Sequence, residues 1–161
     1  MAITIRPATP ADRSLVLEFH RALYDAHRKA VMPAALDPLY AYRNWLETLA
    51  QDVDALLASS KSVVLLAFEG DRACGYISGH LEEDRRRVLA MRGVIEDWYV
   101  DPALRGQGVG KKLYVTIESI FREAGCEAME SATWPFNDGA RRAHEALGFH
   151  EIEVRYRKVL K

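Results

Sequence analysis

The sequence predicts an α/β fold of the α+β type, with a mixed, mostly antiparallel central sheet flanked by helices. Three observations support this prediction: short alternating apolar runs recur along the chain, stretches of helical apolar spacing stand between them, and no linker or internal repeat divides them. The chain has 161 residues, of which 49% are hydrophobic and 28% charged, as is ordinary for one soluble domain. We therefore expect residues 1–161 to form a single domain with the element order β-α-α-β-β-β-α-β-α-β.

At the N-terminus we expect a short strand followed by two helices. Apolar and polar residues alternate around Ile5, as in a half-buried strand. The segment 9–12 combines a capping threonine, a proline at the first helical position and an early carboxylate, so a helix should begin here and end near His27. After two prolines, an apolar stripe of helical spacing predicts a second helix from about Tyr40 to Leu57.

Three strands are expected next. The run from Val63 to Phe68 has the length and composition of a buried strand, and the turn residues 69–72 predict a hairpin with a second strand from Ala73 to Leu81. These two strands should pair antiparallel. A charged turn at residues 82–87 leads into a third strand from about Leu89 to Val100.

The C-terminal third should hold a long helix, a strand, a short helix and closing strands. Apolar residues at helical spacing predict a helix from Gly108 to Ala124, and a strand follows from Ala128 to Thr133. A short helix should begin at Asn137 or Asp138 and end at Leu147. The residues from Phe149 to Leu160 indicate one or two closing strands.

The charge balance and the cysteines disfavour several classes of function. Lys and Arg number 22 against 23 Asp and Glu, a formal net charge of -1, so the chain has no general basic field to hold nucleic acid. The two cysteines, Cys74 and Cys126, lack the paired spacing of a zinc site and are too few for a disulfide scaffold, and the histidines do not cluster. We expect no metal, no membrane partner and, without a visible signal peptide, a cytoplasmic protein.

One strand-turn-helix unit stands apart from the rest. Gly106, Gly108 and Gly110 occupy alternate positions at the start of a helix, where a backbone without Cβ atoms can approach a ligand and point free N–H groups at it. Arg105 and Lys111 add positive charge. This pattern is typical of a diphosphate cradle, although a loop that merely turns the chain can have the same spacing.

Two common phosphate-binding loops do not match this unit. The Walker pattern requires Ser or Thr directly after Gly-Lys, and Lys112 follows Lys111 here. The dinucleotide fingerprint requires a third glycine where Leu113 stands, within a parallel βαβ unit that the predicted order lacks.

Two motifs instead resemble those of the GNAT superfamily of N-acetyltransferases. The segment from Arg105 to Gly110, after a Val-Asp-Pro turn, resembles the family's acyl-CoA motif R/Q-x-x-G-x-G/A. Asn137 followed by the segment from Ala143 to Phe149 resembles its second motif, an Asn and then A-x-x-Y-E-K-L-G-F. The resemblance covers nearly the whole chain. It implies a GNAT-like fold and direct transfer of an acetyl group from acetyl-CoA to a primary amine.

The resemblance also implies which residues bind acetyl-CoA. In the family, the strand before the loop splays from its neighbour, and its backbone pairs with the pantetheine arm. The expected cofactor-binding residues are Trp98, Tyr99, Val100, Arg105, Gly106, Gln107, Gly108, Val109, Gly110, Lys111 and Asn137. Asn137 could alternatively serve only as a helix N-cap.

Glu96 and His144 are the expected catalytic residues. An alkylammonium group has a pKa near 10.4, so a carboxylate must help to remove its proton, and Glu96 matches the family position that binds the amine or acts as base. Alternatively, Glu96 belongs to a structural ion pair. Strand alternation predicts that Asp97 faces the opposite side of the sheet. His144 stands where the family has the Tyr that protonates the departing sulfur, and it could donate a proton or only pack near the cofactor.

Two subfamilies bear on the acceptor. The strand from Ile95 to Val100 resembles that of diamine N-acetyltransferases, and the stretch from Ala143 to Lys158 resembles aminoglycoside 6'-N-acetyltransferases. Both indicate a small cationic amine, although the aminoglycoside enzymes have an Asp where Ala132 stands. The alternative function is an acyl-CoA-binding sensor or interaction module without turnover. The family also makes a homodimer possible.

Overall fold

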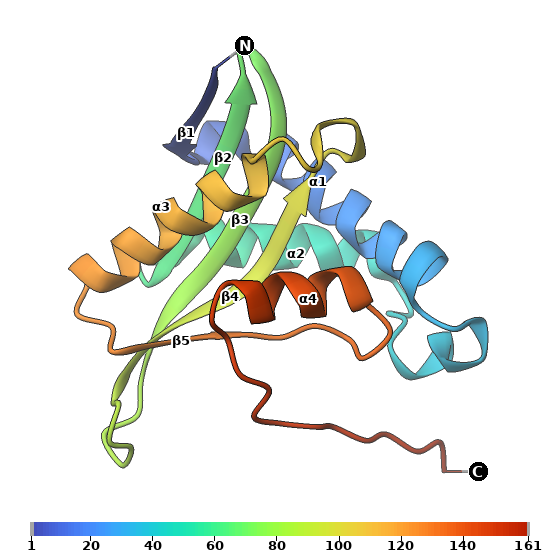
Figure 1. Ribbon diagram of the computed structural model, residues 1–161. Helices are drawn as coiled ribbons and strands as arrows, with labels where there is room; N and C mark the ends of the chain where they lie inside the picture. Colours follow the sequence, from blue (N-terminus) through green and yellow to red (C-terminus); the bar gives the residue numbers. More distant parts are fainter. Residues whose placement is uncertain (1, 161) are drawn as a thin grey trace.

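A five-stranded sheet organises the chain in the computed structural model, which describes residues 2–160 (Figure 1). The strands lie in the order β1-β2-β3-β4-β5. Their bounds are β1 Ile3–Pro7, β2 Ser62–Glu69, β3 Arg72–Glu83, β4 Met91–Val100 and β5 Ala128–Ser131. The first four strands pair antiparallel with their neighbours, and β5 pairs parallel with β4. The predicted mixed, mostly antiparallel sheet is therefore confirmed.

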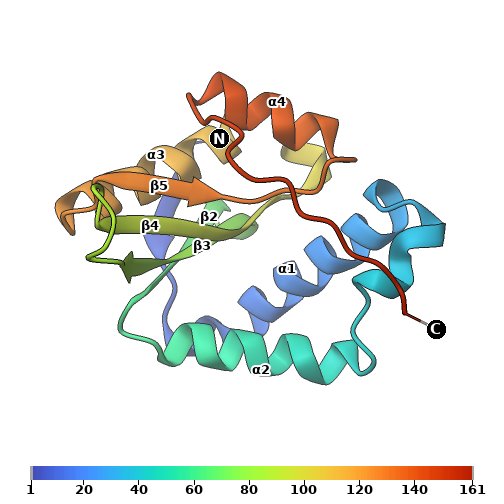
Figure 2. The same ribbon diagram turned by 90° about the horizontal axis from the view of Figure 1, so that it is seen from below.

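Helices cover both faces of this sheet (Figure 2). One face carries α1, Arg13–Ala26, and α2, Trp45–Ala58, and the other carries α3, Val109–Glu123, and α4, Asp138–Ala146. The second helix begins at Trp45, later than the expected Tyr40, because residues 40–44 form an irregular turn after the separate 3-10 turn Ala34–Leu39. None of the helices in residues 2–160 has both the length and the apolar character needed to cross a membrane.

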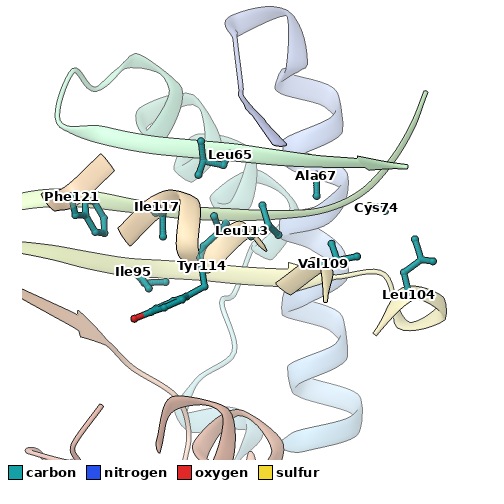
Figure 3. Close-up of a cluster of buried hydrophobic side chains, with 11 residues drawn as sticks. Leu65, Ala67, Cys74, Ile95, Leu104, Val109, Leu113, Tyr114, Ile117 and Phe121 are labelled. Carbon is teal, nitrogen blue, oxygen red and sulfur yellow. The ribbon is translucent and has the colours of Figure 1, made fainter. Parts of the chain in front are cut away.

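The core lies in two layers because the central strands are apolar on both faces. On β2, Leu65 and Ala67 pack against α3, whereas Val64 and Leu66 pack against α1 and α2. This two-sided burial explains the continuous apolar run that marks β2 in the sequence. Figure 3 shows the α3 layer, in which Leu65 and Ala67 lie near the buried side chains of that helix.

Two glycines make room for the largest fully buried side chain of the α3 layer. Phe121 is fully buried, and its ring lies against Gly79 of β3 and Gly93 of β4. A Cβ atom at Gly79 would lie 2.9 Å from Phe121 Cζ, closer than packed atoms tolerate. The last turns of α3 can therefore sit close to the sheet only because these strand positions lack a side chain.

The predicted closing strands are wrong. Among the described residues, no strand follows α4, and residues 150–160 are exposed (Figure 1). The segment runs back along α4, where Glu151 pairs with Arg141, and Arg157 then donates to the Leu39 carbonyl at 2.8 Å. A strand pattern forms a strand only beside a free sheet edge, and these contacts hold the segment elsewhere. The observed order ends at α4.

Candidate active site

The site begins where β4 and β5 separate. The two strands pair only from Arg92 to Ile95 and from Ala128 to Ser131, and β5 ends there, earlier than the sequence suggests. β4 continues to Val100. Within residues 2–160, this last part of β4 has a strand neighbour on the β3 side alone. Its other backbone edge can pair with a ligand, as the family resemblance implies for residues 98–100.

A glycine-rich turn follows directly on β4 and opens α3. Gly106 and Gly108 have φ values of 77° and 85°, in the left-handed region that favours glycine. A Cβ atom at either position would meet nothing within 4 Å, so the backbone there is accessible. The first helical hydrogen bond runs from the Lys112 N–H to the Gly108 carbonyl, and the preceding N–H groups of the helix are left for a ligand. The loop thus fits a diphosphate.

The other residues predicted to bind the cofactor surround this loop, but in different ways. Arg105 is exposed, and its Nε donates to the Val100 carbonyl at 3.0 Å. Gln107 turns back to the Ala103 carbonyl, and Lys111 is exposed. The Val109 side chain is buried in the α3 layer, so only its backbone can reach a ligand.

Trp98 and Tyr99 leave β4 on opposite faces of the sheet. The Trp98 ring stacks on Tyr114 of α3 with 5.8 Å between centroids, and Tyr99 packs against Phe19 of α1 at 5.7 Å. The Gly110 backbone lies close to the Trp98 ring, since a Cβ there would be 3.5 Å from the indole nitrogen. Trp98 therefore connects the strand edge to the glycine loop.

The prediction that Asp97 faces away from Glu96 is wrong, because the pairing of β3 with β4 contains a β-bulge at this point. Ser78 pairs with Asp97 and Gly79 with Ile95, so Glu96 is the extra residue. Ile95 packs in the α3 layer, whereas the Asp97 carboxylate lies 3.2 Å from His20 Nδ1 on α1. Glu96 Oε1 lies 3.0 Å from His80 Nδ1, on the same face. The bulge brings two carboxylates to the α1 side.

The Asp97 carboxylate is held in a buried polar network. His20 Nδ1 lies 3.0 Å from the Tyr76 hydroxyl, its Nε2 lies 3.7 Å from Asp52, and Ser78 Oγ donates to Asp97 at 3.3 Å. Burial lowers the pKa of His20, but the hydrogen bond and charge of Asp97, with help from Asp52, outweigh it and raise the pKa above the ordinary value. Burial and the nearby Asp97 raise the pKa of Tyr76 well above its usual range.

Glu96 is the more accessible of the two carboxylates. Its side chain is 44% exposed, against 19% for Asp97, and its ion-pair partner His80 is itself 33% exposed. Asp97 is occupied by His20, so it provides a fixed negative charge. Glu96 can exchange its partner for an incoming cation.

The second motif forms α4, and His144 lies at its inner side. His144 Nδ1 lies 2.6 Å from the Ala140 carbonyl, which can only accept, so Nδ1 carries the proton of the neutral ring. The other nitrogen, Nε2, lies 2.7 Å from Ser131 Oγ. Asn137 Oδ1 accepts from the Ala140 N–H at 3.1 Å and caps α4. Ser131 ends β5 opposite Ile95, so it connects His144 to the point where the strands separate.

Sequence reasoning missed His20, His80 and Ser131. His20 lies four residues after the buried Val16 and one after the buried Phe19, so it shares the face of α1 that points toward the sheet. This position could have identified His20 as a residue of the site. His80 and Ser131 acquire their contacts only through strand pairing and the docking of α4. Within residues 2–160, no group of three His, Cys, Asp or Glu side chains is placed to hold a metal ion.

Comparisons with known proteins agree with this geometry. The acetyltransferase (GNAT) family model matches residues 19–149. An aminoglycoside N(6')-acetyltransferase type 1 of Stenotrophomonas maltophilia is 33% identical over 155 residues, which cover 94% of this chain and 89% of that protein. A thialysine N-epsilon-acetyltransferase of Bos taurus is 33% identical over 58 residues, 36% of this chain and 34% of that protein.

The fold is also found in a solved structure of AAC(6')-Iy bound to the bisubstrate analogue CoA-S-monomethyl-acetylneamine. It superposes with a TM-score of 0.76 over 99% of this chain and 100% of that one, at 21% sequence identity. A second structure of AAC(6')-Iy, in complex with CoA, has the same TM-score and is 22% identical over 98% of this chain and 95% of that one.

We predict that Asp97→Asn lowers the pKa of His20. Burial of the ring is the largest single influence, and after the substitution only the more distant Asp52 opposes it with a full charge. The His20 ring resonances, followed by NMR against pH, report this pKa. Asp54→Asn is the matched control, because Asp54 pairs with Arg13 instead. An unchanged His20 midpoint in Asp97→Asn would contradict the ion pair.

Proposed function

This chain belongs to the acetyltransferase (GNAT) family, and we propose that within this family it acetylates a primary amine of an aminoglycoside-like acceptor. It is an N-acetyltransferase that uses acetyl-CoA as the donor. The proposal for the acceptor is supported by the relative that is 33% identical over nearly the whole chain. The observation that carries it is the bulged Glu96–Asp97 pair, which presents negative charge where β4 separates from β5. A polyamine-like acceptor and a sensor without turnover are less favoured.

Acetyl-CoA supplies an acetyl thioester, and the residues around the strand separation fit it. The accessible backbone at Gly106 and Gly108 and the first N–H groups of α3 would hold the diphosphate, with positive charge from Arg105 and Lys111. The backbone edge of β4 from Trp98 to Val100, which no strand covers on the β5 side, would pair with the pantetheine amides once Arg105 releases the Val100 carbonyl. A backbone N–H on that edge would also stabilise the oxyanion that forms at the thioester carbonyl.

We assign to Glu96 the removal of a proton from the acceptor. An acceptor ammonium group is attracted by Glu96 and by the fixed charge of Asp97, and it gives its proton to the Glu96 carboxylate. The resulting amine attacks the thioester carbon, so that a C–N bond forms, the C–S bond breaks and the nitrogen releases its second proton to solvent. Ala132 brings no charge, and recognition of further amino groups therefore falls to Asp97 and to Asp52 of α2.

We assign the protonation of the departing sulfur to Ser131, supported by His144. His144 Nδ1 donates to the Ala140 carbonyl, so the ring becomes an imidazolium when Nε2 also carries a proton. Nε2 then donates to Ser131 Oγ. The Ser131 hydroxyl can then give its own proton to the thiolate and regain one from Nε2. In this scheme, His144 replaces the tyrosine of the family motif by acting through a second residue at the end of β5.

Two properties of the whole protein complete the proposal. Cys74 and Cys126 are both free thiols, which agrees with a reducing cytoplasm, where acetyl-CoA is also present. We propose this location. We further propose that the enzyme is a homodimer.

Gly108→Asp should abolish measurable acetyl-CoA binding, because the new carboxylate would stand against the diphosphate. Gly125→Asp is the matched control. Gly125 has a φ of 84°, nearly the value of 85° at Gly108, and equally open surroundings, but it lies at the other end of α3. Calorimetric titration with acetyl-CoA should show binding to the control alone. Equal affinities in the two variants would refute this placement of the diphosphate.

The acceptor is tested with purified protein, acetyl-CoA and a panel of aminoglycosides, polyamines, amino acids and short peptides. We expect release of free thiol, and mass detection of an acetylated product, with aminoglycosides. Glu96→Gln should lower kcat/KM by roughly 10²- to 10⁴-fold without loss of acetyl-CoA binding, as is typical when a general base is removed. The control, Glu123→Gln, changes an exposed glutamate of α3 far from the site. Turnover with polyamines alone would contradict the proposed acceptor.

The proton path predicts that Ser131→Ala and His144→Phe lower kcat by similar factors. Because the two groups act in series, the double variant should be no slower than the slower of the two single variants. Ser119→Ala, on the exposed side of α3, serves as control. A Ser131→Ala variant that keeps the wild-type kcat would exclude the serine from the path.

A further inference from the structure

A buried arginine lies on the α1 side of the sheet, beyond the residues of the active site. Arg92 of β4 pairs with Glu82 of β3, near the hairpin that joins these two strands (Figure 1). The next residue, Gly93, lies against Phe121 of the α3 layer, so strand alternation places Arg92 on the opposite face. The Arg92 side chain is only 9% exposed. Burial of a guanidinium is costly unless carboxylates compensate it, so its partners decide what this position can do.

Two carboxylates flank the guanidinium, one from each neighbouring strand. Arg92 Nη2 lies 3.0 Å from Glu82 Oε1, and Nη1 contacts Oε1 of Glu130 on β5. We call these three residues the Arg92 cluster. The side chains of Glu82 and Glu130 are still 46% and 36% exposed. The contacts with Arg92 use one oxygen of each carboxylate, so the second oxygen of each can accept a hydrogen bond from a ligand.

The Arg92 cluster has an excess of negative charge, because two carboxylates share one guanidinium. The arginines of the nearby hairpin do not remove this excess, since each has another partner. Arg85 pairs with Glu83, and Arg86 and Arg87 pair with Asp84. The cluster can therefore attract a cation.

The cluster continues the face of the sheet on which Glu96 lies. Glu130 pairs with Val94, and Val94 pairs on its other side with His80, the ion-pair partner of Glu96. Two residues along a strand span roughly 7 Å, so about one such step separates Glu130 from Glu96. An acceptor with one amine at Glu96 can therefore reach the cluster with another of its groups.

The guanidinium itself is not fully satisfied. Arg92 Nε is buried and has no hydrogen-bond partner within residues 2–160. Buried donors are nearly always paired, so stability alone does not explain this group. Because no acceptor holds Nε, the guanidinium can turn and offer a donor to a ligand oxygen. The cluster thus combines acceptors for an ammonium group with a donor for a hydroxyl oxygen.

We propose that the Arg92 cluster is a second binding subsite, which holds a distal amino group of the acceptor and a neighbouring hydroxyl group. The inference rests on the proposed acetylation of an amine at Glu96 and adds a further contact for the same acceptor. Glu82 and Glu130 accept hydrogen bonds from the ammonium group, and Arg92 donates to the hydroxyl oxygen. An amino sugar offers both groups, whereas a polyamine chain offers Arg92 no oxygen. The subsite therefore favours amino sugars with several amino groups.

The test compares two acceptors that differ in their number of amino groups. Kanamycin carries several, and 6-amino-6-deoxyglucose carries one. In the wild type, kcat/KM should be higher for kanamycin. Glu82→Gln and Glu130→Gln should each lower the ratio of the two kcat/KM values by roughly 2- to 5-fold, mainly through the KM for kanamycin, as for the loss of one partly exposed charge pair. Both acceptors are measured on the same variant, so a change in the amount of folded protein cancels from the ratio.

Glu83→Gln is the matched control. Glu83 is adjacent to Glu82 and almost equally exposed, 47% against 46%, but alternation turns it to the other face of β3, where it pairs with Arg85. The control removes the same charge and should leave the ratio unchanged. Added salt should lower the ratio more in Glu83→Gln than in Glu82→Gln, because salt screens the contact that Glu82→Gln has already lost.

Two results would overturn the subsite while the acetyltransferase activity stands: similar kcat/KM values for both acceptors in the wild type, or a ratio that neither Glu82→Gln nor Glu130→Gln lowers. If neither acceptor is acetylated, the proposed function fails, and calorimetric titration of the CoA-bound protein with kanamycin decides about the subsite. Weaker binding in Glu82→Gln than in Glu83→Gln would then support it, and equal binding would contradict it.

Discussion

The active site depends on one structural constraint, the separation of β4 from β5 after Ile95 and Ser131. Up to Ile95 and Ser131, the backbone N–H and C=O groups of β4 and β5 form hydrogen bonds with each other. Beyond it, β4 continues with one edge free, and the chain then turns through accessible glycines into the N-terminus of α3. A ligand with amide groups and a diphosphate matches the strand edge and the helix terminus in turn. The carboxylates of Glu96 and Asp97 lie beside the same separation, where we propose that donor and acceptor meet.

The β-bulge at Glu96 gives this opening its acceptor side. Without it, alternation would place one of two consecutive carboxylates in the apolar α3 layer, at a high cost in desolvation. With it, both lie toward α1, where His20 contacts Asp97 and His80 contacts Glu96. The two carboxylates thus differ in exposure and in partner. That difference supports separate roles, a fixed charge for Asp97 and an exchangeable proton site for Glu96.

Features encoded over short distances could be predicted from the sequence, and those that arise from long-range pairing could not. The glycine loop, the hairpin between β2 and β3 and the cap at Asn137 each depend on neighbouring residues. The side of the sheet that Asp97 faces depends on how β4 pairs with β3, and the contact of His144 with Ser131 depends on the docking of α4. The C-terminal alternation predicts a strand, but a strand also needs a neighbouring sheet edge, and the contacts of Glu151 and Arg157 hold this segment elsewhere.

The account is tested most directly by a crystal structure of the protein with coenzyme A and an aminoglycoside bound together. It predicts the pantetheine arm along the free edge of β4 beyond Ile95, the diphosphate on the N-terminus of α3 and an acceptor amine against Glu96 on the α1 side. Coenzyme A bound away from the separated strands, or an acceptor amine remote from Glu96, would contradict the claim that this separation brings donor and acceptor together.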